Sequence, residues 1–435
     1  MTEIVISGMG IVSALGNNVE ENLQALLEKR TGIAPLRYLK TSHTEFPVGE
    51  VKMTNEEMLA LLDISEDVPT VRTALMGILA LREALQNAGI CDERWKGEVG
   101  RWKLKDGPRI ALISGTTVGG MDKSEQYYLD FLENDLRNEY ISTHDCGTCT
   151  EMLADYFGIF SQLDTISTAC SSAANAIILG AEFLKSGRAD IVVAGGSECI
   201  TKFHLNGFNT LMILDKEPCR PFDASRAGLN LGEGAAFVVM ESKENFDKRK
   251  QVNTFLTVLC KLSGYANTCD AYHQTASSPD GEGAYLAMKQ ALEDAGLQPQ
   301  DIDYINAHGT GTPNNDVSEG TAIMRVFGNK PPPVSSTKSF TGHTTSAAGC
   351  VESVISILAL QYNFIPINLN FAEKMPEISF SPYREMEEIT PSQISNSKSQ
   401  VSHHTSHISI NHILKNSFGF GGNDTCLIFS KTDDT

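Results

Sequence analysis

The sequence lacks the features that mark a membrane-spanning or nucleic-acid-binding protein. No apolar run is long enough to cross a bilayer as a helix. Basic residues are scarce, with 35 Lys and Arg against 54 Asp and Glu and a formal net charge of −19, whereas binding to phosphates needs clustered cations. The first residues carry no basic stretch before an apolar one, so we expect no secretory signal and a cytoplasmic protein.

The sequence contains cysteines, but their spacing does not indicate a disulfide framework. The ten cysteines lie at positions 91, 146, 149, 170, 199, 219, 260, 269, 350 and 426 of the 435-residue chain. Scattered cysteines in a long chain without a secretory signal favour reduced thiols over disulfides. Most such residues are small core side chains, so the functional question is which of them departs from that role.

Short apolar strands alternate with periodic helices along the chain. Strand-like segments are Glu3–Ser7, Arg109–Ile113, Ile191–Ala194, Ala235–Met240, Asp303–Asn306 and Thr425–Phe429, and helix-like ones are Thr70–Ala88, Tyr285–Ala295 and Ala347–Leu360. This alternation predicts an α/β protein with buried parallel or mixed sheets.

Two segments share one order of strand, turn and small-residue helix, namely Asp164–Ile178 and Pro333–Ile357. We therefore predict a duplicated α/β unit. Its N-terminal half would cover residues 1–258, and its C-terminal half would cover residues 259–435.

Cys170 is the first candidate for chemistry. It follows a β-type run, Thr165–Thr168, and precedes a helical one, Ser171–Leu184. Amide groups and the dipole at a helix N-terminus favour the thiolate, which is the nucleophilic form of cysteine. A buried structural thiol is the alternative at this position.

Two histidines and a lysine follow predicted strands in the second half. His308 lies in NAHGTGTP (306–313), directly after a strand, where open α/β folds bind ligands. A hydrogen-bonded turn would explain His308 equally well. His343 and Lys338 share SSTKSFTGH (335–343), and a lone Lys with a lone His in an otherwise small or apolar segment favours function.

The segment NSFGFGGN (416–423) is the last candidate. Its glycines allow positive φ and close approach of amide groups, so a loop around Phe420 could furnish an oxyanion-hole N–H. Taken alone this is weak evidence, because most glycine-rich loops are only turns.

Together these segments resemble the β-ketoacyl-acyl-carrier-protein synthases of the elongating, synthase II type, in the thiolase superfamily. The motifs are TACSSAANAI, NAHGTGTP, SSTKSFTGH and NSFGFGG, with RPFDASRAGLNLGEGAA at residues 220–236. The resemblance covers essentially the whole chain. It implies a thiolase-type fold, with two related halves in five αβαβα layers, and a homodimer.

The resemblance also implies the chemistry, residue by residue. Cys170 would accept the acyl chain from the phosphopantetheine of an acyl carrier protein as a thioester. The backbone N–H groups of Cys170 and Phe420 would form the oxyanion hole. His308 and His343 would bind the malonyl thioester carbonyl and promote its decarboxylation, so the expected activity is that of a 3-oxoacyl-carrier-protein synthase, an acyltransferase.

Further residues are implied in supporting roles. Lys338 would hold positive charge near the histidines and pair with Glu352, while Thr310 and Thr312 would bind substrate. The gate and acyl pocket would comprise Phe420, Phe418, Val118 and Phe208. We expect no cofactor beyond the carrier's phosphopantetheine. We also expect no metal, because the Lys415 ammonium could replace a monovalent cation that some relatives bind.

The charge of the chain complicates docking of a carrier protein, which is acidic. Relatives place Lys and Arg around the pocket mouth. Here the helix around residues 66–88 offers only Arg72 and Arg82, and Met212 stands where an Arg often follows the Gly207–Phe208 step. We therefore predict a dedicated carrier protein, as in specialised polyene or polyketide synthesis, and neither nucleic acid nor membrane as a partner.

One alternative is a non-catalytic, chain-length-determining partner subunit of a heterodimeric ketosynthase. Cys170 counts against it, because such subunits lack the nucleophile. Initiating synthases of the family have a Cys-His-Asn set of catalytic residues. In this sequence His343 makes the corresponding set Cys-His-His. A thiolase proper, which condenses coenzyme A thioesters without decarboxylation, lacks the NSFGFGG ending.

Two metal-like patterns are interpreted as structural. Cys146 and Cys149, with His144 nearby, form a single CxxC pair, which is weak evidence for zinc and fits the start of a helix. The four histidines His403, His404, His407 and His412 fall in or near the alternating HISINHIL, which predicts a strand with surface or edge histidines.

Overall fold

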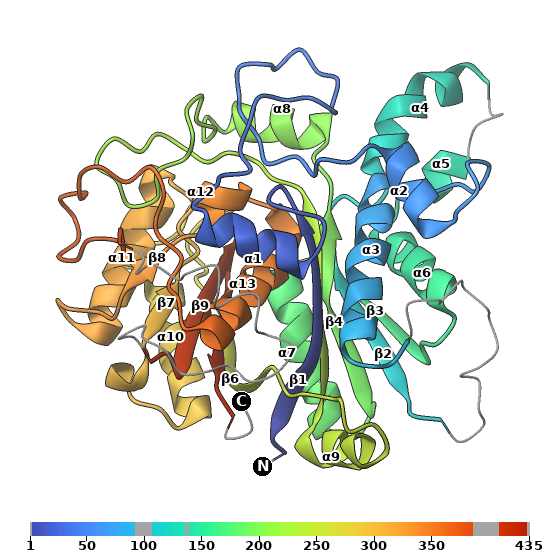
Figure 1. The fold of residues 1–435 in the computed structure, drawn as a ribbon. Helices are drawn as coiled ribbons and strands as arrows, with labels where there is room; N and C mark the ends of the chain where they lie inside the picture. Colours follow the sequence, from blue (N-terminus) through green and yellow to red (C-terminus); the bar gives the residue numbers. More distant parts are fainter. Residues whose placement is uncertain (1, 92–106, 135–138, 386–408, 433–435) are drawn as a thin grey trace.

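The computed structural model describes residues 2–91, 107–134, 139–385 and 409–432 (Figure 1). The strands are β1 (Ile4–Ser13), β2 (Ile110–Gly115), β3 (Gln162–Ile166), β4 (Ile191–Glu198), β5 (Gly234–Ser242), β6 (Cys260–Cys269), β7 (Tyr304–Asn306), β8 (Val334–Ser335), β9 (His412–Gly419) and β10 (Asn423–Ser430).

The α-helices are α1 (Val19–Leu27), α2 (Asn55–Leu62), α3 (Arg72–Asn87), α4 (Met121–Glu133), α5 (Glu139–Ser142), α6 (Cys146–Phe157), α7 (Ser172–Lys185), α8 (Lys202–Thr210), α9 (Lys243–Val252), α10 (Glu282–Ala295), α11 (Pro313–Phe327), α12 (Lys338–Thr341) and α13 (Ala348–Tyr362). Within the described ranges, single-turn 3₁₀ helices lie at Pro299–Asp301 and Thr345–Ala347.

The described strands form one sheet in the order β3-β2-β4-β5-β1-β6-β10-β9-β7-β8. In its first half β1 and β4 each pair antiparallel with β5, while β2 lies parallel between β4 and β3. The same pattern of pairings recurs in the second half, with β6, β10, β9, β7 and β8 in the corresponding places. A duplicated unit produces such a repeat. The division near residue 258 stays a prediction.

Helices fill three layers around the two halves of this sheet (Figure 1). On one side, α3 and α6 pack on β1–β5, and on the other α10 packs on β6 and β10 with α11 beside it. Between the halves lie α7 and α13, which contact each other and strands from both halves. The five-layer αβαβα arrangement predicted from the sequence is confirmed.

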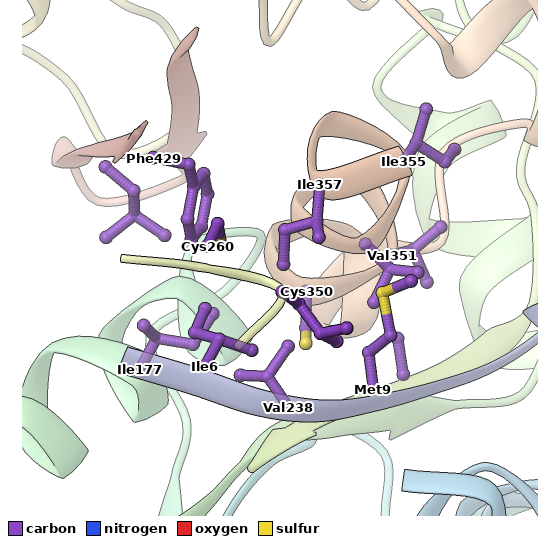
Figure 2. Packing of buried hydrophobic residues seen from close by; sticks show 14 of the residues in the cluster. Ile6, Met9, Ile177, Val238, Cys260, Cys350, Val351, Ile355, Ile357 and Phe429 are labelled. Atoms are coloured by element: carbon purple, nitrogen blue, oxygen red, sulfur yellow. The ribbon is translucent and has the colours of Figure 1, made fainter. Parts of the chain in front are cut away.

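The central layer holds the largest hydrophobic cluster. Figure 2 shows Val351 of α13 beside Met9 of β1. Nearly every residue of α13 is buried, as expected for a helix with sheet on both sides. At Gly349 a Cβ atom would lie 2.4 Å from the backbone nitrogen of Ala174 in α7, so α13 approaches α7 more closely than a side chain would allow.

Some sequence expectations change in the structure. The segment from residue 416 was expected to be a loop, but Asn416–Gly419 continue strand β9, because they pair with β10. Cys146 begins α6, as expected. His403, His404 and His407 lie outside the described residues, while His412 begins β9 with its Nδ1 2.8 Å from Ser430 Oγ. Among the described helices none is long and apolar enough to span a membrane.

Candidate active site

Cys170, His308 and His343, which are far apart in the sequence, line one cavity of about 330 Å³. Its apolar wall comprises Phe208, Leu211, Ile213, Leu229, Phe418 and Phe420, and its polar wall includes His273, Ser277, Thr310, Thr312, Asn314 and Asn315. The cavity therefore joins a nucleophile and two imidazoles to both an apolar and a polar surface.

Cys170 lies in a tight turn between β3 and α7. Ala169 has φ of +53°, a left-handed conformation that is uncommon for a residue with a side chain. The Thr168 N–H donates to Ser172 Oγ at 2.9 Å, and that hydroxyl donates to Ala169 O at 2.6 Å. These bonds hold the turn, which places Cys170 two residues before α7 begins at Ser172, with 6% of its surface exposed.

The resting state of Cys170 differs from the sequence expectation of a thiolate. Burial raises the pKa of the Cys170 thiol to about 11, while the Lys338 ammonium and the Phe420 N–H act in the opposite direction. Burial therefore outweighs the helix N-terminus, and the thiol is protonated at neutral pH.

The turn between β9 and β10 presents the Phe420 N–H to the cysteine sulfur. Gly419 makes this possible, because a Cβ atom there would lie 2.8 Å from the carbonyl oxygen of Thr168. Gly421 and Gly422 have φ of +85° and +77°, which a residue with a side chain rarely adopts.

Asn423 ties this turn to the nucleophile through contacts whose partners the sequence alone does not show. Its Oδ1 accepts hydrogen bonds from Ser171 Oγ at 2.7 Å, Asn175 Nδ2 at 2.7 Å and Asn267 Nδ2 at 3.1 Å. Ser171 follows Cys170 in the chain, and Asn423 follows Gly422 in the turn that carries Phe420. The Asn423 side chain therefore holds the backbone N–H groups of Cys170 and Phe420, which are expected to form the oxyanion hole, in a fixed relative position.

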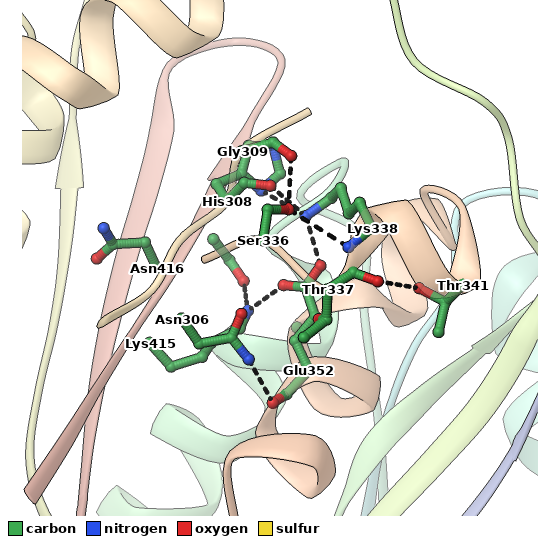
Figure 3. Close-up of polar contacts among 12 residues, drawn as sticks. Asn306, His308, Gly309, Ser336, Thr337, Lys338, Thr341, Glu352, Lys415 and Asn416 are labelled. Atoms are coloured by element: carbon green, nitrogen blue, oxygen red, sulfur yellow. Dashed lines mark hydrogen bonds and ion pairs between the residues drawn. The ribbon is translucent and has the colours of Figure 1, made fainter. Parts of the chain in front are cut away.

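Lys338 and Glu352 form the expected ion pair beneath His308 (Figure 3). The Lys338 Nζ also donates to the carbonyl oxygen of His308 at 2.6 Å and lies 3.3 Å from its Nδ1. An ammonium has only hydrogens to offer, so Nδ1 must be the acceptor. The proton of a neutral His308 is therefore on Nε2.

Lys415 is a second lysine in this buried cluster. Its Nζ lies 3.0 Å from Glu352 Oε2, and it donates to Ser417 Oγ. The side chain is fully buried. A lysine inside the otherwise apolar start of β9 was visible in the sequence, but its partner on α13 was not.

The two imidazoles are close and neutral. The rings of His308 and His343 lie 5.4 Å apart, nearly perpendicular. Burial lowers the pKa of both well below the ordinary value, and Lys338 and Lys415 lower it further. Each histidine therefore carries one ring proton at neutral pH.

Glu319 of α11 holds the backbone beside His308. Its carboxylate accepts the N–H groups of His308 at 2.8 Å and Gly309 at 2.7 Å, and the amide of Asn416 at 3.0 Å. The predicted substrate residues Thr310 and Thr312 follow directly, with their hydroxyl oxygens 2.8 Å apart.

Three of the four predicted pocket residues line the cavity. Phe420 stacks on Phe208 with ring centroids 5.8 Å apart, and Phe418 lies 5.6 Å from the ring of His308. Val118 is buried in the hydrophobic cluster of α3 and α6 and does not border this cavity. Its predicted place in an acyl pocket concerns a pocket that a second copy would complete, so it stays a prediction.

Comparison with known proteins now identifies the family. The β-ketoacyl synthase N-terminal domain model matches residues 1–245, and the C-terminal domain model matches residues 259–372. The chain belongs to the β-ketoacyl synthase family. It is 32% identical to 3-oxoacyl-[acyl-carrier-protein] synthase 2 of Coxiella burnetii over 99% of both chains.

Solved β-ketoacyl synthase structures share the fold. The ishigamide ketosynthase/chain length factor matches with a TM-score of 0.83 and 26% identity, over 99% of each chain. A β-ketoacyl synthase from Burkholderia phymatum STM815 matches with a TM-score of 0.80 and 26% identity, over 99% of this chain and 100% of that one. The non-catalytic alternative is not favoured, because this synthase retains Cys170 and both histidines on one cavity.

The raised pKa of Cys170 predicts how the thiol reacts. Labelling of Cys170 by iodoacetamide should accelerate about tenfold per pH unit from pH 7 to pH 9, since only the thiolate reacts. Lys338→Met should slow labelling, because it removes a cation that lowers the pKa. Mass spectrometry of the labelled peptide measures both effects. A labelling rate that levels off below pH 8 would contradict a buried, protonated thiol.

Proposed function

We propose that this synthase condenses a malonyl unit, held on a carrier protein, with an acyl chain held on Cys170, and releases carbon dioxide. The observation that carries the proposal is one cavity that holds a cysteine, the N–H of Phe420 and two neutral imidazoles. The product would be a 3-oxoacyl thioester two carbons longer than the acyl primer.

The first step loads Cys170. Its sulfur attacks the carbonyl carbon of an acyl thioester as the thiol proton leaves to an adjacent imidazole. The N–H groups of Cys170 and Phe420 stabilise the negative oxygen of the tetrahedral intermediate. The thiol of the phosphopantetheine then departs with the proton, leaving an acyl thioester on Cys170.

The second step forms the carbon nucleophile. The Nε2–H of His308, with a ring N–H of His343, donates to the thioester carbonyl of the malonyl group. As the bond to the carboxylate breaks, carbon dioxide leaves and its electron pair forms an enolate, which these donors stabilise. The enolate carbon attacks the acyl thioester of Cys170, and the cysteine leaves as a thiolate, which takes up a proton from water to restore the resting thiol.

We further propose that the reaction needs no bound cofactor beyond the phosphopantetheine arm of the carrier protein. The nucleophile, the oxyanion donors and the proton carriers are all side-chain or backbone groups of this chain. The described cysteines are free thiols, which suits a reducing compartment, so a cytoplasmic location is part of the proposal.

Product analysis tests this function. With malonyl and acyl carrier proteins, the wild type should yield the 3-oxoacyl carrier detected by mass spectrometry. Cys170→Ala should lower condensation at least about 100-fold yet still release carbon dioxide from the malonyl carrier, whereas His343→Ala should lose that release. Cys91→Ala is the matched control. Undiminished elongation by Cys170→Ala would refute the proposal.

Carrier docking would use an apolar rather than a basic surface. Phe203, Leu211 and Met212 are 59%, 41% and 86% exposed, and Leu211 borders the cavity. Arg220 nearby is already paired with Asp215 at 2.8 Å. We therefore propose a dedicated carrier protein whose contact helix offers apolar side chains, as a specialised polyene or polyketide pathway would supply.

A single charge should broaden carrier use. Met212→Arg should raise kcat/KM several-fold with an acidic housekeeping carrier protein at low salt, and the gain should fade at high salt. Val252→Arg is the control, because Val252 is 91% exposed at the end of α9, away from α8 (Figure 1). Equal effects of the two substitutions would contradict docking beside the cavity.

We propose that a second copy of the chain pairs along β3. Among the described strands β3 ends the sheet and pairs only with β2, and its Leu163 is 40% exposed. An open edge strand invites pairing, and a two-fold arrangement would give each copy the same contact. A related subunit at this edge is the alternative, since one solved relative is named as a ketosynthase together with a chain length factor.

Sedimentation of the purified chain tests this pairing. The wild type should be a dimer, and Leu163→Lys should weaken it at least about tenfold, because a buried lysine would be unpaired at the interface. Val252→Lys should leave the dimer unchanged. A wild type that is monomeric at micromolar concentration would contradict the homodimer.

A further inference from the structure

Lys415 adds a second ammonium group to the ion pair of Lys338 and Glu352. Glu352 of α13 lies between two ammonium groups, that of Lys338 from α12 and that of Lys415 from β9 (Figure 3). All three side chains are at most 2% exposed. A buried surplus charge is costly, so a fold that keeps one invites a functional explanation.

Glu352 uses its two oxygens differently. Oε1 contacts Lys338, while Oε2 faces Lys415 at 3.0 Å. Because Lys415 takes part of the negative charge, Lys338 is not fully neutralised by Glu352. Its ammonium keeps the contacts at 2.6 Å and 3.3 Å with the carbonyl oxygen and Nδ1 of His308.

The surplus charge acts on both imidazoles. Around His308 and His343 stand charged or titratable groups from every packed element: Lys338 of α12, Glu352 of α13, Lys415 of β9, Glu319 of α11, His204 of α8 and Cys170 before α7. After burial and Lys338, Lys415 is a further group that lowers the pKa of both His308 and His343.

We propose that Lys415 is a positioning residue for decarboxylation, which holds Glu352 so that the Lys338 ammonium stays directed at His308 and both imidazoles remain neutral in mildly acidic solution. Lys415 touches no reacting atom. This inference rests on the proposed function, because it assigns Lys415 a part in the same reaction.

The consequence for pH dependence follows from the sign of the charge. Without Lys415, Glu352 neutralises Lys338 and draws it from His308, so less positive charge opposes protonation of the imidazoles. Their pKa values rise towards the ordinary value. Decarboxylation requires neutral imidazoles and is lost as the pH falls through these pKa values, so the acid limb of its profile moves to higher pH.

The test compares Lys415→Met with the wild type between pH 5 and pH 9. Carbon dioxide release from a malonyl carrier protein should show an acid limb shifted upwards by about one pH unit, the size that a nearby charge gives, with a lower kcat. Acyl loading of Cys170 should change much less. Lys431→Met is the control, because Lys431 contacts Asn363 at 2.6 Å rather than Glu352.

Two further measurements separate charge from structure. Lys415→Arg, which keeps the cation, should retain the acid limb of the wild type. Ammonium chloride should partly restore decarboxylation by Lys415→Ala, whereas choline chloride at equal ionic strength should not, because choline is too large for a buried space. If Lys415→Met does not fold, Lys415→Gln takes its place.

An unshifted acid limb in Lys415→Met or Lys415→Gln, or an equal shift in Lys415→Arg, would overturn the inference. These outcomes are distinct from failure of the proposed function. That failure would appear as a wild type that forms no 3-oxoacyl product at any pH.

Discussion

The contact of the Lys338 ammonium with His308 is the interaction on which the rest of the site depends. It fixes the tautomer of the imidazole, leaving its proton on the nitrogen that can serve a substrate. Lys338 begins α12, and Glu352 lies on α13, the next α-helix of the chain. Both helices are buried, so the Lys338 ammonium is held in the interior beside His308. The close approach of α13 to α7 at Gly349 places the same cluster beside the turn that carries Cys170.

Burial sets opposite shifts on the two kinds of catalytic group. It raises the pKa of the thiol and lowers the pKa of the imidazoles, so the resting site holds a neutral thiol and neutral rings above a charged cluster. Neutral groups suit an uncharged thioester, and the charge that develops during reaction meets preorganised donors. The net charge of −19 of the whole chain does not set the charge of the active site. It bears instead on how a carrier protein docks.

Much of the fold and site could be predicted from local sequence patterns. Apolar runs located β2, β4 and β5, periodicity located α3 and α10, and the motifs around Cys170, His308 and His343 identified side chains that the structure brings to one cavity. Contacts that depend on three-dimensional neighbours could not be predicted. Asn423 of β10 reaches Ser171 and Asn175 at the start of α7 in the central layer. Burial of Cys170 outweighs its position at the helix N-terminus, and no local sequence pattern shows this.

The protonation state of His308 tests the account most directly. In protein labelled with ¹⁵N-histidine, with the His308 signals assigned by their loss in His308→Ala, the side-chain nitrogen shifts report tautomer and charge. The account predicts a neutral ring protonated on Nε2 throughout pH 6 to 8. A His308 ring that is doubly protonated at pH 7, or that carries its proton on Nδ1, would contradict it.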